Sequence, residues 1–190
     1  MEPMRLPDDL QRCVDFHGHL CPGVVIGYLA ARVAMRELSV ARAYDEEMVA
    51  IVENDTCAVD AIQLLTGCTF GKGNLIFRDY GKMVFTFATR ANGRSVRLCL
   101  KPVAPSDMEA VPEDQRRRRR IEFMLEADPA TCFDLQRDVL DELPATATIR
   151  DSAPCDLCGE RVMVTRLRDR GDRRVCVPCD ERLLKESPSP

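Results

Sequence analysis

The two histidines of the chain and one of its cysteines fall in a single short segment, residues 16–23 (FHGHLCPG). Pro22 suits the first turn of a helix and therefore places Cys21 at the N-cap. At that position free backbone amides and the helix dipole stabilise a thiolate. His17 and His19 precede it in a loop, so the segment predicts a transition-metal site or a thiol activated by a neighbouring base. The alternative is a buried cysteine beside two capping histidines.

A second segment, residues 53–57 (ENDTC), repeats this local pattern. It follows a predicted strand and places Cys57 in a first helical turn, which Asp55 or Thr56 would cap. Two cysteines at the positive ends of two helices can converge on one cation or one anionic substrate. Asp60, one turn after Cys57, would be a further ligand or an orienting carboxylate. Taken alone, Cys57 fits a small core residue equally well.

Residues 66–74 (TGCTFGKGN) are rich in glycine and resemble a phosphate-binding loop only in part. Three residues instead of four separate the first glycine from the Gly-Lys pair, and a glycine replaces the Ser/Thr hydroxyl. We expect a turn that positions Cys68 or Lys72 at a pocket, with a plain loop as the alternative.

Four cysteines near the C-terminus have the spacing of a structural zinc site. They form Cys-x2-Cys, a spacer of 17 residues and a second Cys-x2-Cys: Cys155, Cys158, Cys176 and Cys179. Two such turns present four thiolates to one tetrahedral ion, and a helix over residues 180–185 would complete a treble clef. This segment has few large apolar side chains, so we expect it to need the metal for folding. Two surface disulfides or a redox pair are the alternatives.

Charge and composition disfavour several classes of partner. The net charge is −4, and residues 150–190 carry nine basic and eight acidic side chains with no aromatic residue, so nucleic-acid binding is not expected. The arginines at positions 116–120 spread around a helix, which favours a solvated surface or contact with a neighbouring protein chain. No apolar run is long enough to span a membrane and no secretory signal is evident, so we expect a cytoplasmic protein.

The elements that must position these residues indicate two domains. An α+β core over residues 1–150, with an antiparallel sheet flanked by helices, precedes a four-cysteine finger with a disordered tail over residues 151–190. The predicted helices are 6–15, 22–38, 58–65, 113–127 and 129–143, and the predicted strands are 48–52, 75–77, 83–89 and 95–100.

The chain resembles the FmdE family, which is named after formylmethanofuran dehydrogenase. The matching segments are residues 16–23, 53–63, 66–75 and 79–82, together with the paired C-terminal cysteines. The resemblance implies an α+β core with an auxiliary treble-clef zinc finger, an intimate homodimer and a cysteine/histidine cleft able to bind metal. The residues of that cleft would be His17, His19, Cys21 and Cys57, with Asp60, Cys68 and Lys72 as neighbours.

Three functions follow as hypotheses. The first is a metal-binding accessory or redox component related to the molybdenum or tungsten formylmethanofuran dehydrogenase, with an oxidoreductase as its partner. The others are an independent thiol- or metal-dependent enzyme and a zinc-finger adaptor that binds protein or nucleic acid. The candidate catalytic residues are His17, His19, Cys21, Cys57, Asp60 and Lys72. The candidate ligands are the four finger cysteines for zinc, and His19, Cys21 and Cys57 for a second transition metal in the core.

Overall fold

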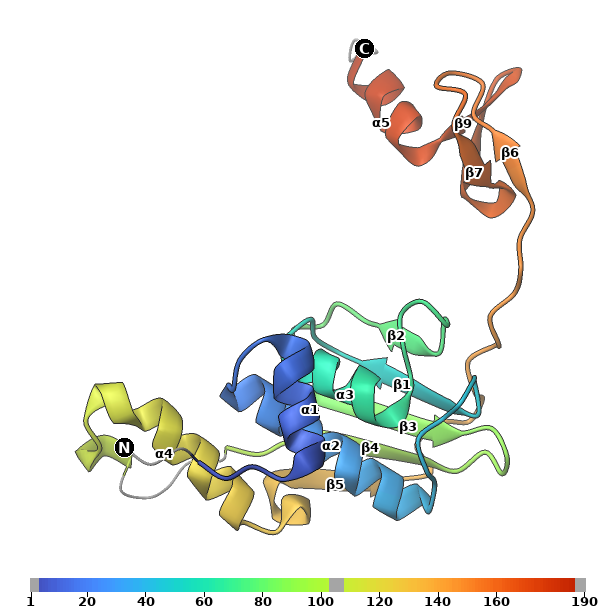
Figure 1. Cartoon of the computed structure of the whole chain (residues 1–190). Coiled ribbons are helices and arrows are strands. Elements are labelled where there is room, and N and C mark those ends of the chain that lie inside the picture. The colour runs from blue at the N-terminus through green and yellow to red at the C-terminus, as the bar shows by residue number, and fades with distance from the viewer. Residues whose placement is uncertain (1–3, 103–107, 187–190) are drawn as a thin grey trace. The chain divides into compact units, whose positions relative to one another are not determined.

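A computed structural model describes residues 4–102 and 108–186 of the chain (Figure 1). The chain divides into two compact units, Met1–Ala147 and Thr148–Pro190, and each is described by itself. The tail expected to be disordered, residues 187–190, lies outside the described residues. Among the helices that the structure describes, none combines the length and apolar character needed to cross a bilayer.

The first unit is built on a five-stranded sheet with the order β2-β1-β3-β4-β5. Its strands are β1 (Met48–Val52), β2 (Leu75–Phe77), β3 (Val84–Thr89), β4 (Ser95–Leu100) and β5 (Phe133–Arg137). The α+β class is confirmed, but the sheet is mixed and not wholly antiparallel. The β1–β2 pair is parallel, with Ala50 opposite Leu75, because a helix crosses over between these two strands. The other three pairs are antiparallel.

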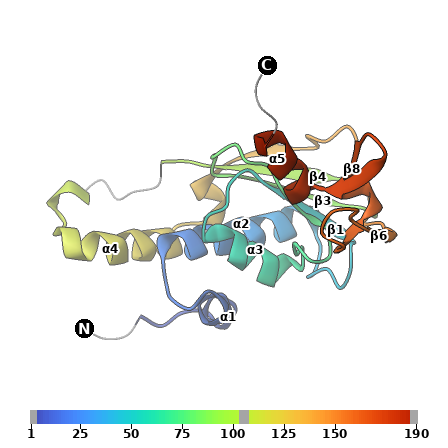
Figure 2. The same cartoon turned by 90° about the horizontal axis from the view of Figure 1, so that it is seen from above.

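Helices cover one face of this sheet (Figure 2). The long helix α2 (Pro22–Leu38) is buried on nearly all sides, as its apolar composition predicts, and packs against α3 (Ala58–Thr66) and the sheet. Helix α1 (Asp8–His17) lies outside this pair and contacts both of its members. Helix α4 (Glu113–Glu126) contacts α2 through its second half, where Ile121 and Met124 are buried. A short 3-10 turn, Met108–Ala110, precedes α4.

The helix predicted over residues 129–143 is wrong. A 3-10 turn, Pro129–Cys132, leads directly into β5, which pairs with β4. The sequence of β5 alternates apolar and polar residues, so that Phe133 is buried while Asp134 is exposed. That period of two belongs to a strand, and pairing with β4 outweighs the helix-start signal of the proline.

The second unit consists of two β-hairpins and a helix. The first hairpin pairs β6 (Ser152–Pro154) with β7 (Arg161–Met163), and after a 3-10 turn (Val164–Arg166) the second pairs β8 (Leu167–Arg170) with β9 (Arg173–Cys176). Helix α5 (Val177–Glu186) follows. The arrangement fits a small metal-binding finger of the treble-clef kind. Its buried cluster contains only Val175 and three cysteines: Cys155, Cys176 and Cys179.

Candidate metal centres

The first candidate centre lies at the start of α2, where Cys21 occupies the predicted N-cap position. Its backbone is extended, with φ −145° and ψ 160°, and Pro22 begins the helix. The backbone N–H of Val24 donates to Cys21 Sγ over 3.4 Å. The sulfur therefore faces the amides at the positive end of the helix, a position that suits a thiolate ligand.

His17 reaches the same point from the last residue of α1. Gly18 ends that helix in the left-handed region at φ 96°, which turns the chain back toward α2. His17 Nδ1 lies 2.7 Å from Asp60 Oδ2, and because a carboxylate only accepts, Nδ1 carries the proton. The free nitrogen, Nε2, then faces Cys21 Sγ at 3.9 Å. A carboxylate that orients a histidine in this way is the usual second partner of a metal-binding imidazole.

Cys57 completes the group from the residue before α3. Its sulfur, Cys21 Sγ and a His17 ring nitrogen all lie within 4.8 Å of one another. Two glycines of α2 permit this approach. A Cβ atom at Gly23 would lie 2.8 Å from Cys57 Cβ, and one at Gly27 would lie 2.0 Å from the carbonyl oxygen of Ala58. The sequence analysis missed the role of these glycines, although their spacing of four residues within a buried helix was visible.

The electrostatics of the two sulfurs favour a cation between them. Burial is the main cause that raises the pKa of Cys57, followed by the hydrogen bond and charge of Cys21. The charge of Asp60 acts in the same direction. A second thiolate is therefore costly beside the first unless a positive ion compensates both. Two thiolates and one imidazole are the ligands that zinc, iron, nickel or copper prefer over magnesium or calcium.

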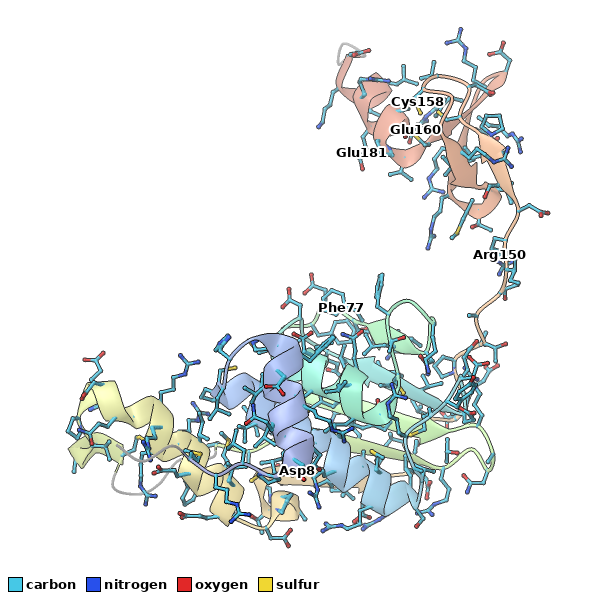
Figure 3. The ribbon with its side chains drawn as sticks, viewed as in Figure 1. Asp8, Phe77, Arg150, Cys158, Glu160 and Glu181 are labelled. Carbon is cyan, nitrogen blue, oxygen red and sulfur yellow. The ribbon has the colours of Figure 1, made fainter. Side chains whose placement is uncertain are left out.

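A pocket of about 430 Å³ opens beside this group. His17, Cys57 and Asp60 form part of its wall, and Phe70 and Phe77 form another part. Phe77 ends the edge strand β2 and lies at the border of the unit (Figure 3). The remaining lining residues are Val52, Asn54, Asp55, Thr56, Val59, Gln63 and Leu75. A three-ligand centre at the side of a pocket leaves a coordination position that an outside molecule can reach.

Three residues considered as candidates lie apart from this centre. The ring of His19 stacks on that of His17, with centroids 4.7 Å apart, but the ligand atoms that converge come from His17 and not from His19. Lys72 donates from Nζ to the carbonyl oxygens of Tyr44 and Asp45 and is not among the pocket-lining residues. It fastens the glycine-rich turn to the loop before β1. Cys68 is fully buried, and burial raises the pKa of its thiol.

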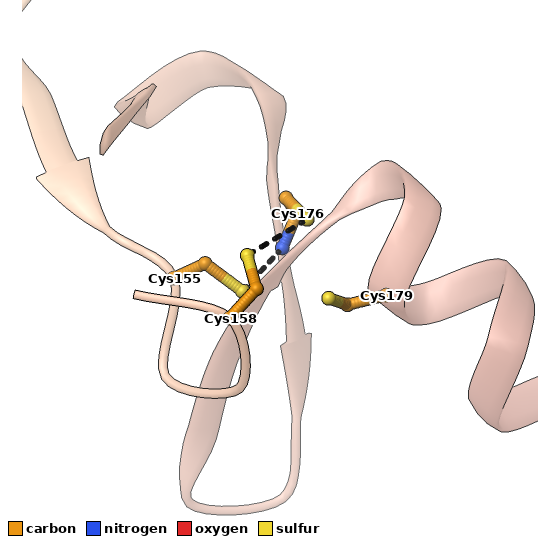
Figure 4. A group of neighbouring side chains, drawn as sticks. All are labelled: Cys155, Cys158, Cys176 and Cys179. Carbon is orange, nitrogen blue, oxygen red and sulfur yellow. Dashed lines mark hydrogen bonds between the residues drawn. The ribbon is translucent and has the colours of Figure 1, made fainter. Parts of the chain in front are cut away.

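The second candidate centre gathers all four C-terminal cysteines (Figure 4). Cys158 Sγ and Cys176 Sγ are 3.8 Å apart. Tetrahedral ligands about 2.3 Å from a zinc ion are separated by about 3.8 Å, so this sulfur pair already has a suitable spacing. Cys179 lies in the first turn of α5, and Cys176 ends β9. Because three of the four residues are buried, one ion can be enclosed without a water ligand.

The four thiols do not ionise alike without a cation. Backbone N–H groups of Cys158 and Cys176 stabilise the thiolate of Cys155 and lower its pKa to about 6. The hydrogen bond with Cys176 is the main cause that raises the pKa of Cys179 to about 12, and burial adds to it. A divalent ion removes this conflict because it binds all four sulfurs as thiolates.

The comparisons with known proteins agree with this geometry. The FmdE model, described as "FmdE, Molybdenum formylmethanofuran dehydrogenase operon", matches residues 16–143. The chain belongs to the FmdE family. A crystal structure of an FmdE-like protein of tungsten formylmethanofuran dehydrogenase, from Syntrophus aciditrophicus, superposes with a TM-score of 0.67 at 26% identity, covering 90% of this chain and 89% of that one.

A curated relative from Archaeoglobus fulgidus is named a probable S-adenosyl-L-methionine-binding protein. It is 30% identical over 195 residues, which cover 90% of this chain and 52% of the relative. The chain thus spans about half the length of the curated relative that it matches.

Proposed function

We propose that this FmdE protein binds a transition metal in its core through His17 Nε2, Cys21 Sγ and Cys57 Sγ, and a structural zinc ion through the four C-terminal cysteines. The observation that carries the core site is the orientation of His17. Asp60 holds Nδ1, and the other ring nitrogen faces the sulfur atom of Cys21. A capping or core histidine has no need of a carboxylate on one nitrogen and a thiol on the other.

The core metal would keep one coordination position toward the pocket, since the chain supplies three ligands. A metal held in this way polarises or binds a donor atom of a second molecule. The residues around it orient the ligand set: Asp60 fixes the ring of His17, and the amide of Val24 holds the sulfur of Cys21. As an accessory or redox component, the protein would present this site to an oxidoreductase partner related to formylmethanofuran dehydrogenase, and we expect it to act as a homodimer.

Metal content tests the proposal directly. Protein purified without chelator or histidine tag should contain two metal ions per chain by plasma mass spectrometry, and Cys21→Ser and Cys158→Ser should each contain one. Cobalt loading of the Cys158→Ser variant should give a sulfur-to-cobalt charge-transfer band that Cys21→Ser removes. Cys99→Ser is the matched control, because Cys99 belongs to neither group of ligands. Retention of both ions in Cys21→Ser would refute the core site.

The pocket favours an independent metal-dependent enzyme as a second candidate function. Its 430 Å³ can admit a small molecule beside the metal ligands. The name of the archaeal relative makes S-adenosyl-L-methionine one ligand to test, by equilibrium dialysis against the metal-loaded protein. Binding that needs Cys21 would support an active site in the core, whereas no binding would remove this ligand and leave the metal site standing.

A further inference from the structure

The charge around the core pocket has one sign. Among the described residues that line the pocket, the charged side chains are Asp55 and Asp60, and no lysine or arginine is present. Lys72, the cation expected there from the sequence, is held by two backbone carbonyls elsewhere. The pocket therefore offers carboxylates and no basic group to a molecule that enters it.

Metal binding does not reverse this sign, an argument that rests on the proposed function. A divalent ion carries two positive charges, and the thiolates of Cys21 and Cys57 cancel both of them, while His17 is neutral. Asp60 and Asp55 then leave the loaded pocket with a formal charge of about −2. A centre with three histidine ligands would keep its positive charge and attract anions, and this one would not.

Asp55 is the carboxylate that lacks compensation. Asp60 has His17 as its partner at 2.7 Å. Asp55 is exposed, and within residues 4–102 and 108–186 it has neither a hydrogen bond nor an ion pair. It lies two residues before Cys57, on the loop that joins β1 to α3. A cation at Asp55 would thus be held close to the open side of the metal centre.

The other wall of the pocket is apolar and aromatic. Phe70 and Phe77 expose 76% and 43% of their surface, which is unusual for phenylalanine. Val52, Val59 and Leu75 continue this wall. Aromatic faces attract cations and bury apolar groups. A ligand with a cationic head and an apolar body would satisfy both walls at once.

We propose that the pocket selects small organic cations, an ammonium group on an apolar or aromatic body, and that Asp55 is the residue that recognises the charge. The ammonium would lie at Asp55 and the body against Phe70 and Phe77. Phosphate esters and carboxylates of equal size would be excluded, because they meet carboxylates and find no basic partner.

Matched probes test this selection. Calorimetry on the zinc-loaded full chain would compare 2-phenylethylamine with 3-phenylpropionate, which share a body and differ in the sign of their charge. We expect the amine to bind at least about tenfold more tightly. Asp55→Asn should remove most of this preference, whereas Asp141→Asn, an exposed acid outside the pocket lining, should preserve it. Phe70→Leu should weaken the amine and the neutral 2-phenylethanol to a similar extent.

Two results would overturn the proposal. One is equal or tighter binding of the anion, and the other is an amine preference that Asp55→Asn leaves unchanged. The cobalt spectrum of the same samples separates this inference from the proposed function. An intact charge-transfer band without amine selection would reject the cation pocket and keep the metal site, whereas loss of the band in the wild-type protein would reject both.

Discussion

The two thiol groups of this chain differ in what surrounds them. The core group, His17, Cys21 and Cys57, stands on helices that pack against a five-stranded sheet and a large buried cluster. The C-terminal group stands on two short hairpins and one helix, whose own buried cluster contains little besides the cysteines. In the core the fold positions the ligands, whereas in the finger the ligands are most of what the fold has to bury. The same element thus has opposite relations to folding in the two units.

The largest effect should come from removing one finger ligand. Cys176→Ser leaves three sulfurs and a buried hydroxyl where one ion needs four thiolates, so the second unit should unfold. Limited proteolysis followed by mass spectrometry should show cleavage within residues 148–186 and an intact first unit. Cys99→Ser should leave the finger protected. A finger that resists protease after zinc chelation would show that its hairpins fold without metal, and the contrast between the two units would disappear.

A single methyl group at the contact of α2 and α3 should disturb the core site next most strongly. In Gly27→Ala the new Cβ would lie 2.0 Å from the carbonyl oxygen of Ala58, so α3 must shift. We expect a loss of about 1–3 kcal/mol in the free energy of unfolding and weaker core metal binding. Gly71→Ala is the control, because its Cβ would meet nothing within 4 Å. Urea denaturation measures the stability of both variants, and equal stabilities would refute the close contact.

Removing the carboxylate behind His17 should have a smaller effect. Asp60→Asn deletes the charged acceptor of His17 Nδ1 while it preserves the size of the side chain. We expect core metal affinity to fall by about 10–100-fold, with the finger metal unaffected. Competition with a chromophoric chelator measures this in the Cys158→Ser background. Unchanged affinity would mean that His17 is oriented by other contacts, such as its stacking on His19.

The smallest effect concerns a thiol outside both groups. Burial is the main cause that raises the pKa of Cys13 from 9.0 to about 11. In the unfolded chain this thiol ionises near pH 9 while the folded chain keeps its proton, so the folded state loses stability as the pH rises from 9 toward 11. By pH 10 the loss should be about 1 kcal/mol. Denaturation of the wild-type protein and Cys13→Ala at pH 8 and pH 10 should show the steeper fall in the wild type, and equal slopes would contradict it.

The sequence allowed the ligand-bearing segments to be predicted, because their signals are local. Proline after Cys21 marks a helix start, and the spacing of the C-terminal cysteines reports a metal site without further context. The choice between His17 and His19 could not be made, since it depends on Asp60, which is distant in sequence. Lys72 was misjudged for a similar reason: its partners are backbone carbonyls on another loop. The failed helix at residues 129–143 shows how sheet pairing outweighs a local start signal.

The parallel crossover from β1 through α3 to β2 has a consequence for how this protein can diversify. Cys57 and Asp60 stand at the beginning of the crossover, beside the buried core, whereas Phe70 and Phe77 stand at its end, on a loop and on the edge strand. An edge strand has one neighbour, so substitutions and insertions there disturb a single row of hydrogen bonds. Relatives can therefore change the shape and chemistry of the pocket mouth while the metal ligands stay in place. Catalytic capacity and molecular selectivity are inherited here on separate parts of the chain.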